Sequence, residues 1–184
     1  MTLYLVRHGH AAAGWGESLD PGLDDVGRAQ AAAVAEALRH LAPCPLYTSP
    51  LQRTRETAAA FASRWGVPQI EPRVGEIESP DTSDLAGRSA WLAGVMRGRW
   101  NGLGPELQRW RSAVLDALVE IGTASPATVV VTHFIAINVA VGAATDDERV
   151  TCFLPDNCSV TELEVNGDRL RLVQRGAEAV TEVR

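Results

Sequence analysis

The sequence predicts an α/β fold in which helices cover a mostly parallel sheet with an antiparallel edge. Two short apolar runs rich in β-branched residues, Thr2 to Val6 and Ala127 to Thr132, have the composition of buried parallel strands. Amphipathic segments typical of helices lie between them, and a hairpin signal follows near the end of the chain. Together these observations favour a three-layer α/β/α sandwich.

The first predicted helix runs from Asp24 to Leu41. Acidic residues occupy its first turn, and Arg39 and His40 occupy its last, which suits the helix dipole. Apolar residues recur at three- and four-residue spacing, which predicts a buried face. The residues of that face are Val26, Ala29, Ala33, Ala37 and Leu41.

A short strand is expected at Pro45 to Thr48, followed by a helix from Pro50 to Trp65 whose first turn tolerates the proline. Gly66 and Pro68 end this helix. A further strand is predicted from Gln69 to Val74.

The stretch from 75 to 104 is the least regular part of the sequence, with glycine at 75, 87, 94, 98, 102 and 104. Pro80 and Pro105 add two further breaks. We expect an irregular loop or cap over about residues 76–105. It would belong to a single domain of residues 1–184, because a chain of 184 residues is within the usual length of one domain.

Pro105 begins an amphipathic helix with one apolar face, formed by Leu107, Trp110, Val114, Leu118 and Ile121. An apolar, buried helix is predicted from Ile135 to Ala144. Ser159 to Val165 and Arg169 to Gln174 alternate in hydrophobicity around Asn166-Gly167, which predicts a hairpin. This hairpin would supply the antiparallel edge.

Composition excludes several functional classes. With 17 basic and 23 acidic residues, the net charge is −6, so the surface offers nucleic acid no general attraction. Cys44, Cys152 and Cys158 have neither disulfide-framework nor zinc spacing, which suits a reducing cytoplasm. The apolar run at the N-terminus is shorter than a signal peptide needs, and no run is long enough for a membrane span. We expect a cytoplasmic protein without a membrane partner.

Both central strands deliver a histidine to the edge of the sheet where α/β proteins bind ligands. The first ends in Arg7-His8-Gly9, and His133 follows Val131-Thr132. A guanidinium fork, an imidazole and a residue that permits close backbone approach are components of a phosphate site. The sequence therefore predicts that an anionic ligand binds there.

Across residues 3 to 165 the chain resembles the histidine phosphatase superfamily, the phosphoglycerate mutase-like group. The first segment is Leu5-Val6-Arg7-His8-Gly9, like the LxRHG of that family, and the others follow in the family's order. They are Leu23 to Ala31, like L(T/S)xxGxxQA; Ser49 to Arg53, like SxLxR; Val74-Gly75-Glu76, like LxE; Val131-Thr132-His133, like the second-histidine motif; and Asn157 to Val160, like NxSxT/V.

The resemblance implies a phosphatase that hydrolyses a phosphate monoester through a phosphohistidine intermediate, with no metal and no other cofactor. Arg7 and Arg53 would bind the phosphate oxygens, and His8 would attack phosphorus. Glu76 would protonate the leaving group and then activate water, while His133 would hold a phosphate oxygen. The expected substrate is a small phosphorylated metabolite, with a phosphoprotein as the alternative. The sequence makes no prediction of oligomeric state.

The chain departs from the family pattern at three places. His10-Ala11 follows Arg7-His8-Gly9, Phe134 replaces the glycine usual after the second histidine, and no GxWxG stretch follows Glu76. His10 is either a third cation of the pocket or an exposed loop residue. Because of these departures, the motifs do not predict which substrate the protein uses.

The assignment of the proton donor also has alternatives. Glu78, Asp81 and Asp84 are close to Glu76 in sequence, and Glu71 precedes it. Arg55 is expected on the surface, near Arg53.

Three other functions compete with this interpretation. A metal-dependent hydrolase could use His8, His10 and His133 as ligands, but such enzymes generally need a larger barrel and more than four histidines. A non-catalytic module could bind a phosphorylated ligand on the same fold. A phosphoglycerate mutase-type phosphotransferase is the third alternative, and the chain has little room for the insertions of such enzymes.

Overall fold

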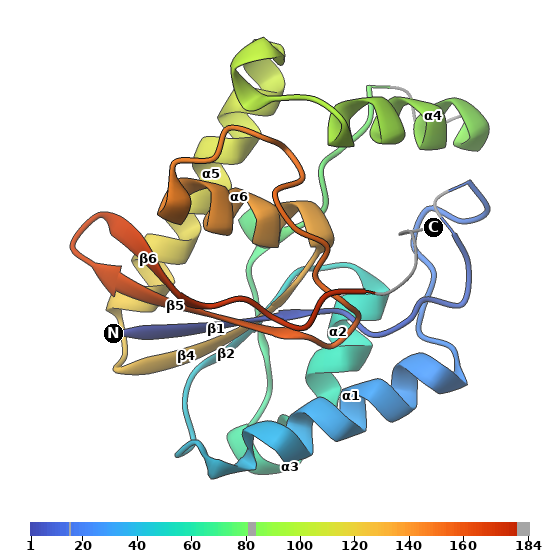
Figure 1. Ribbon diagram of the computed structural model, residues 1–184. Coiled ribbons are helices and arrows are strands. Elements are labelled where there is room, and N and C mark those ends of the chain that lie inside the picture. Colours follow the sequence, from blue (N-terminus) through green and yellow to red (C-terminus); the bar gives the residue numbers. More distant parts are fainter. Residues whose placement is uncertain (15, 81–83, 180–184) are drawn as a thin grey trace.

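Six strands form one sheet in the order β3-β2-β4-β1-β5-β6 (Figure 1). The computed structural model describes residues 1–14, 16–80 and 84–179. The strands are β1 (Thr2–Arg7), β2 (Leu46–Thr48), β3 (Gln69–Ile70), β4 (Ala127–Thr132), β5 (Val160–Asn166) and β6 (Arg169–Gln174). β1 to β4 pair in parallel, whereas β5 and β6 form an antiparallel edge beside β1. The predicted α/β class and its antiparallel edge are confirmed.

The register of the parallel strands brings three strand ends to one level. Arg7 of β1 pairs with Thr132 of β4, and Thr48 of β2 pairs with Val131. The residues that follow these strands, His8, Ser49 and His133, therefore leave the sheet next to one another. This edge carries the candidate site.

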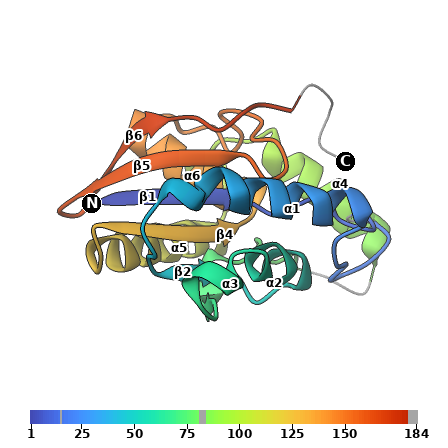
Figure 2. The same ribbon diagram turned by 90° about the horizontal axis from the view of Figure 1, so that it is seen from below.

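Helices cover both faces of the sheet (Figure 2). One face carries α1 (Asp25–Ala37), α2 (Gln52–Ala59) and α3 (Ala62–Trp65), and the other carries α5 (Pro105–Thr123) and α6 (Phe134–Thr145). Alternate residues of the strands face alternate layers. This confirms the predicted three-layer sandwich.

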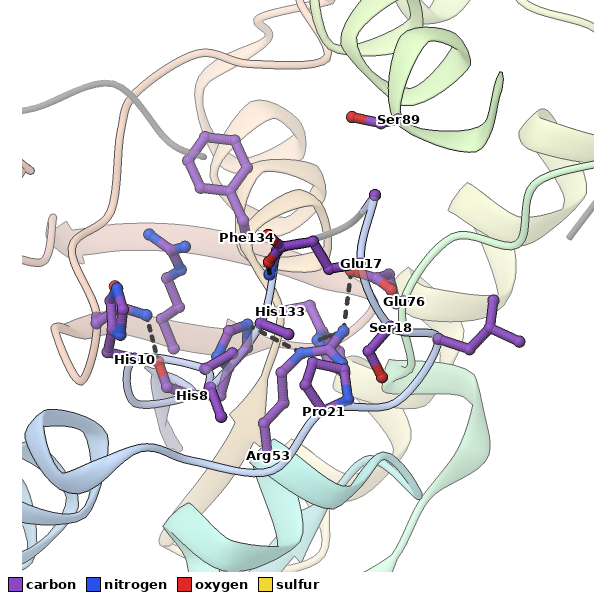
Figure 3. A pocket seen from close by; sticks show the side chains of 18 of the residues that line it. His8, His10, Glu17, Ser18, Pro21, Arg53, Glu76, Ser89, His133 and Phe134 are labelled. Carbon is purple, nitrogen blue, oxygen red and sulfur yellow. Dashed lines mark hydrogen bonds and ion pairs between the residues drawn. The ribbon is translucent and has the colours of Figure 1, made fainter. Parts of the chain in front are cut away.

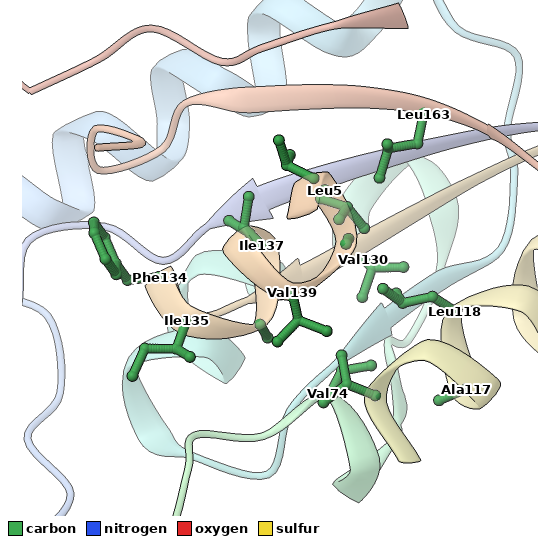
Figure 4. Close-up of a cluster of buried hydrophobic side chains, with 14 of the residues drawn as sticks. Leu5, Val74, Ala117, Leu118, Val130, Phe134, Ile135, Ile137, Val139 and Leu163 are labelled. Carbon is green, nitrogen blue, oxygen red and sulfur yellow. The ribbon is translucent and has the colours of Figure 1, made fainter. Parts of the chain in front are cut away.

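Two hydrophobic cores fill the spaces between these layers. Leu5 and Val130 face α5 and α6, where Leu118 and Ile137 are buried (Figure 4). Val6 and Val131 face the opposite core, which contains Val34, Leu38, Ala58 and Phe61. The central strands are thus inaccessible to solvent on both faces, as their unbroken apolar composition predicted.

The predicted buried face of the first helix is wrong except at Leu41, which is partly buried and packs against the core that contains Val34. Val26 is 57% exposed, and Ala29, Ala33 and Ala37 are exposed as well. The helix instead buries Gly27, Ala31 and Val34, and the 3₁₀ helix η1 (Leu38–His40) continues this stripe at Leu38. In an alanine-rich helix several faces have similar hydrophobicity, and close contact at Gly27 selects among them.

That close contact lies between the start of α1 and the loop after β1. A Cβ atom on Gly27 would overlap the carbonyl oxygen of His10, and one on Gly9 would lie 2.6 Å from the carbonyl oxygen of Gly27. Asp24 caps α1 by accepting from the Gly27 N–H at 2.7 Å. The helix start and the Gly9-His10 segment therefore depend on two glycines for their approach.

Two predicted elements are interrupted. The helix expected from Pro50 to Trp65 starts at Gln52 and divides into α2 and α3, because Phe61 donates to Ala58 in a tighter 3₁₀-type turn. The strand expected from Gln69 to Val74 stops at Ile70, and η2 (Pro72–Val74) follows, because Pro72 has no N–H to continue the ladder. Gly66 ends α3 with φ of 86°, as predicted.

The stretch expected to be irregular contains a helix, α4 (Leu85–Met96), followed by η3 (Trp100–Gly102). Asp84 caps α4 by accepting from the N–H groups of Ala86 and Gly87. The glycines within this helix lower its helix propensity, so the sequence does not predict it. The buried side chains of Leu92 and Val95 fix it to the core.

The remaining predicted elements agree with the structure. α5 begins at Pro105, α6 is buried through most of its length, and β5 and β6 form a hairpin in which Gly167 has φ of 64°. Within the described residues, no helix is both long and apolar enough to cross a membrane.

Gly27→Ala should destabilise the protein by about 1–3 kcal/mol, because the added methyl group overlaps backbone that cannot move independently of the site. Gly94→Ala is the matched control, since nothing lies within 4 Å of its added Cβ in α4. That change should stabilise the protein by up to about 1 kcal/mol. Urea unfolding measures both values, and equal effects would contradict the assigned contact.

Candidate active site

The backbone of the segment Arg7-His8-Gly9 is held by hydrogen bonds on several sides where β1 ends. The His8 N–H donates to the Thr132 carbonyl at 3.0 Å, and the Gly9 N–H donates to Thr57 Oγ1 at 3.0 Å. Asn157 Nδ2 donates to the His8 carbonyl at 2.9 Å. These bonds connect the segment to β4, α2 and the loop before β5, so its side chains start from a rigid base.

The hydrogen bond of His8 identifies which of its ring nitrogens is unprotonated. Nδ1 lies 2.8 Å from the Gly9 carbonyl oxygen, which only accepts, so Nδ1 carries the hydrogen. Nε2 is then the unprotonated nitrogen, and Arg53 Nε donates toward it at 3.4 Å. Burial, followed by the nearby charges of Arg53 and Arg7, holds the pKa of His8 well below its usual range. The imidazole is therefore neutral at physiological pH.

Arg53 occupies the centre of the site (Figure 3). It comes from α2, and its side chain is only 3% exposed. Its Nη2 lies 3.4 Å from His133 Nδ1 and 3.0 Å from Glu76 Oε1. One guanidinium thus contacts both histidines and the carboxylate.

Arg7 supplies a second guanidinium. Its Nη1 donates to the Pro155 carbonyl at 2.8 Å, and its charge lies 5.3 Å from the centre of the Phe134 ring. Its buried Nε has no hydrogen-bond partner in the described part of the chain. Burial lowers the pKa of Arg7 to about 10, which leaves it charged at neutral pH.

His133 lies between β4 and the N-terminus of α6, whose unpaired N–H groups favour an anion. Its ring centre is 5.3 Å from that of His8. Its Nε2 lies 2.7 Å from Ser49 Oγ, and its Nδ1 faces Arg53. Burial, together with Arg53 and His8, holds the pKa of His133 well below its usual range.

Glu76 lies beyond η2, and two guanidinium groups contact its carboxylate. Oε1 binds Arg53, and Oε2 accepts from Arg88 Nη2 of α4 at 2.7 Å. The side chains of Glu76 and Arg88 are 10% and 8% exposed. The carboxylate is thus oriented by Arg53 of α2 on one side and by Arg88 of α4 on the other.

These residues line one cavity of about 670 Å³. Arg7, His8, Arg53 and His133 line it together with Glu76, while Glu17 and Ser89 lie farther out (Figure 3). The buried part combines two guanidiniums with two neutral imidazoles, so it attracts anions.

The structure brings all five predicted site residues, Arg7, His8, Arg53, Glu76 and His133, to this cavity. His10 is on its exposed rim, where Nδ1 contacts Asp24 Oδ2 at 2.7 Å. Among the described residues, no group of three or more His, Cys, Asp or Glu side chains is placed to hold a metal ion.

The alternatives to Glu76 are placed differently. Glu78 is exposed, Asp84 caps α4, and Glu71 binds Arg73. Asp81 lies outside the described residues. Arg55 is exposed, as expected.

Sequence reasoning missed Arg88, Ser49 and the function of Asn157. Ser49 and Asn157 belong to recognised segments, but their contacts depend on how the segments meet in space. Arg88 lies in a stretch without any matching motif, and a buried arginine on a glycine-containing helix has no signal in a single sequence.

Comparison with known proteins matches residues 3–178 to the Histidine phosphatase superfamily (branch 1). A glucosyl-3-phosphoglycerate phosphatase from Mycolicibacterium vanbaalenii is 34% identical over 110 residues. That match covers 53% of this chain and 49% of the relative, so the chain matches about half the length of this curated protein.

Solved structures share the fold. A mycobacterial glucosyl-3-phosphoglycerate phosphatase in complex with VO3 has a TM-score of 0.72 and 24% identity, covering 96% of this chain and 99% of that one. A phosphoserine phosphatase variant from Entamoeba histolytica, in complex with phosphoserine, has a TM-score of 0.72 and 19% identity, covering 96% of both chains. The predicted phosphoglycerate mutase-like fold is confirmed.

Stability should fall as the pH drops below about 6.5, because the unfolded chain then protonates histidines that remain neutral in the fold. His8→Asn keeps a donor for the Gly9 carbonyl and should reduce this loss by up to about 1.4 kcal/mol per pH unit. Urea unfolding from pH 7 to pH 5 measures the slope.

His40→Asn is the matched control for this measurement. His40 Nδ1 also faces a backbone carbonyl, that of Ala37 at 2.9 Å, but its ring is exposed. If both variants change the slope equally, burial of His8 is not the cause.

Proposed function

The chain belongs to the histidine phosphatase superfamily, and from this we propose that it hydrolyses a phosphate monoester through a phosphohistidine intermediate, without a metal or other cofactor. One observation carries the proposal. A buried neutral imidazole, His8, has its unprotonated Nε2 beside Arg53, in a cavity that Arg7 also lines.

The phosphoryl group would bind between Arg7 and Arg53. Each guanidinium presents donors to equatorial oxygens, where the charge of the transition state develops. The unpartnered Nε of Arg7 and the N-terminus of α6 supply further donors. His133 would hold another oxygen through Nδ1. These groups neutralise the dianion with side chains that are already in place.

His8 Nε2 would then attack phosphorus in line with the leaving oxygen. Its lone pair forms the N–P bond as the P–O bond to the leaving group breaks. The Nδ1–H bond to Gly9 keeps the ring oriented and supports the positive charge that the ring acquires. Water would later attack the phosphohistidine and release inorganic phosphate and neutral His8.

Glu76, once protonated from solvent, would give that proton to the leaving oxygen in the first step and would take a proton from the attacking water in the second. Its Oε1 binds Arg53 Nη2. Bound phosphate competes for the same guanidinium, so substrate binding would release Oε1 to face the leaving oxygen. Arg88 keeps the other oxygen in position during this exchange.

We propose a small phosphorylated metabolite in the cytoplasm as the substrate. The cavity of about 670 Å³ suits a ligand of that size. The name of the matched relative, a glucosyl-3-phosphoglycerate phosphatase, supports this class of substrate. Release of phosphate from a panel of monoesters in EDTA tests the activity. Loss of turnover in EDTA would favour the metal-dependent alternative, and transfer to an added phosphoglycerate would indicate a mutase.

His8→Ala should abolish turnover, because no other side chain replaces the attacking nitrogen. Inorganic phosphate or vanadate should still bind through Arg7 and Arg53, as isothermal titration calorimetry can measure. Mass spectrometry of the wild-type enzyme, quenched without acid, should find phosphate on His8. His40→Ala is the control for exposed histidines, and substantial turnover by His8→Ala would exclude the proposed nucleophile.

Glu76→Gln should slow hydrolysis of an alkyl phosphate by about 10²–10⁴-fold and of p-nitrophenyl phosphate by less, because a weakly basic leaving group needs little protonation. Single-turnover kinetics separate this step from hydrolysis of the phosphoenzyme. The exposed Glu78→Gln is the matched control in the same segment. Equal losses with both substrates would show that Glu76 is not the acid.

A further inference from the structure

A chain of buried hydroxyl groups leads away from His133 on the side opposite the cavity centre. His133 Nε2 lies 2.7 Å from Ser49 Oγ, and Ser49 Oγ lies 2.7 Å from Thr54 Oγ1. Thr54 Oγ1 in turn lies 2.7 Å from the Leu51 carbonyl oxygen. Ser49 and Thr54 are completely buried, so water does not complete their hydrogen bonding.

The direction of each hydrogen bond follows from the end of this chain. The Leu51 carbonyl can only accept, so the hydrogen of Thr54 points to it. Thr54 Oγ1 must then accept the hydrogen of Ser49. Ser49 Oγ, having donated, accepts from His133 Nε2–H and from the Leu51 N–H at 3.3 Å. Both hydroxyl hydrogens then have an acceptor, and the Ser49 carbonyl, 3.1 Å from Thr54 Oγ1, can also accept the Thr54 hydrogen.

If the hydrogen bonds ran in the opposite direction, one close oxygen–oxygen contact would have no hydrogen. If Ser49 donated to His133, Thr54 would have to donate to Ser49. Two oxygens, Thr54 Oγ1 and Leu51 O, would then face each other at 2.7 Å with no hydrogen between them. The neutral ring of His133 therefore carries its hydrogen on Nε2, which leaves Nδ1 as an acceptor toward Arg53.

We propose that Thr54 is a positioning residue that acts through Ser49 to keep the hydrogen of neutral His133 on Nε2, which makes Nδ1 the nitrogen that protonates when phosphate binds. The inference rests on the proposed function. A monoester that arrives as the monoanion supplies the proton. Its P–OH bond breaks, the hydrogen forms the N–H bond at Nδ1, and the phosphoryl group becomes a dianion. Nδ1–H then donates to that dianion, and Ser49 remains the acceptor for Nε2–H throughout.

The test is NMR of imidazole nitrogens in protein labelled with ¹⁵N-histidine, using His133→Gln to assign the His133 signals. In the free wild-type protein Nε2 should be protonated and Nδ1 unprotonated. Saturating inorganic phosphate should protonate Nδ1 and leave Nε2 unchanged. A free protein with the hydrogen on Nδ1 would overturn the proposal, and so would unchanged His133 signals with phosphate bound.

Thr54→Val removes the acceptor for the Ser49 hydrogen, which then points to His133 Nε2. The ring hydrogen should move to Nδ1 in the free protein, and kcat should fall about tenfold, the effect of one displaced hydrogen bond. Thr54→Ser keeps the hydroxyl and should restore the wild-type signals and turnover.

Thr48→Val is the matched control. Thr48 is equally buried, and its hydroxyl donates to the Ser49 carbonyl at 3.1 Å rather than to Oγ. It should leave the His133 signals unchanged. If Thr54→Val lowers turnover without moving the hydrogen, its effect is packing and the proposal fails. If the wild-type protein has no phosphatase activity, the proposed function fails, while the NMR signals still decide where the hydrogen lies.

Discussion

The register of β1 against β4 is the constraint on which the rest of the site depends. With Arg7 opposite Thr132, the next residue of each strand is a histidine, and the two rings reach the same point of the sheet edge. β2 joins at the same level and contributes Ser49. A shift of one residue in any of these pairings would turn side chains to the opposite layer and separate the histidines. The hydrophobic alternation of the buried strands therefore also specifies the geometry of the site.

The site places two arginines beside two neutral imidazole rings in a buried space, and the positive charge of the arginines needs a negative partner there. Burial and the two arginines keep His8 and His133 uncharged, which preserves a lone pair on each ring. Glu76 balances part of the charge of Arg53. Under the proposed function, phosphate would bring to Arg53 the negative charge that Glu76 otherwise supplies. Binding of phosphate to Arg53 and release of Glu76 from Arg53 would thus be one exchange of partners.

Sequence predicted the elements that carry strong local patterns and the residues that lie within them. The strands around Leu5 and Val130 and the helix at Pro105 depend on composition and spacing that are visible in one sequence. The prediction of the buried face of α1 is wrong because that face depends on a contact between Gly27 and His10. These two residues belong to different segments, and no periodic pattern in the sequence connects them. For the same reason the five residues at the cavity were predictable from their motifs, whereas Arg88 and the hydroxyl chain behind His133 required the packed structure.

The pairing of Arg88 with Glu76 has a consequence for how such a site changes through evolution. α4 lies beside the cavity, so mutations in α4 can change which substrate the cavity accepts. The same helix holds one oxygen of the carboxylate. A mutation that moves α4 to fit another substrate also moves Arg88, and with it the orientation of Glu76. Under the proposed function, selection for a new substrate must therefore act on substrate recognition and on proton transfer by Glu76 together.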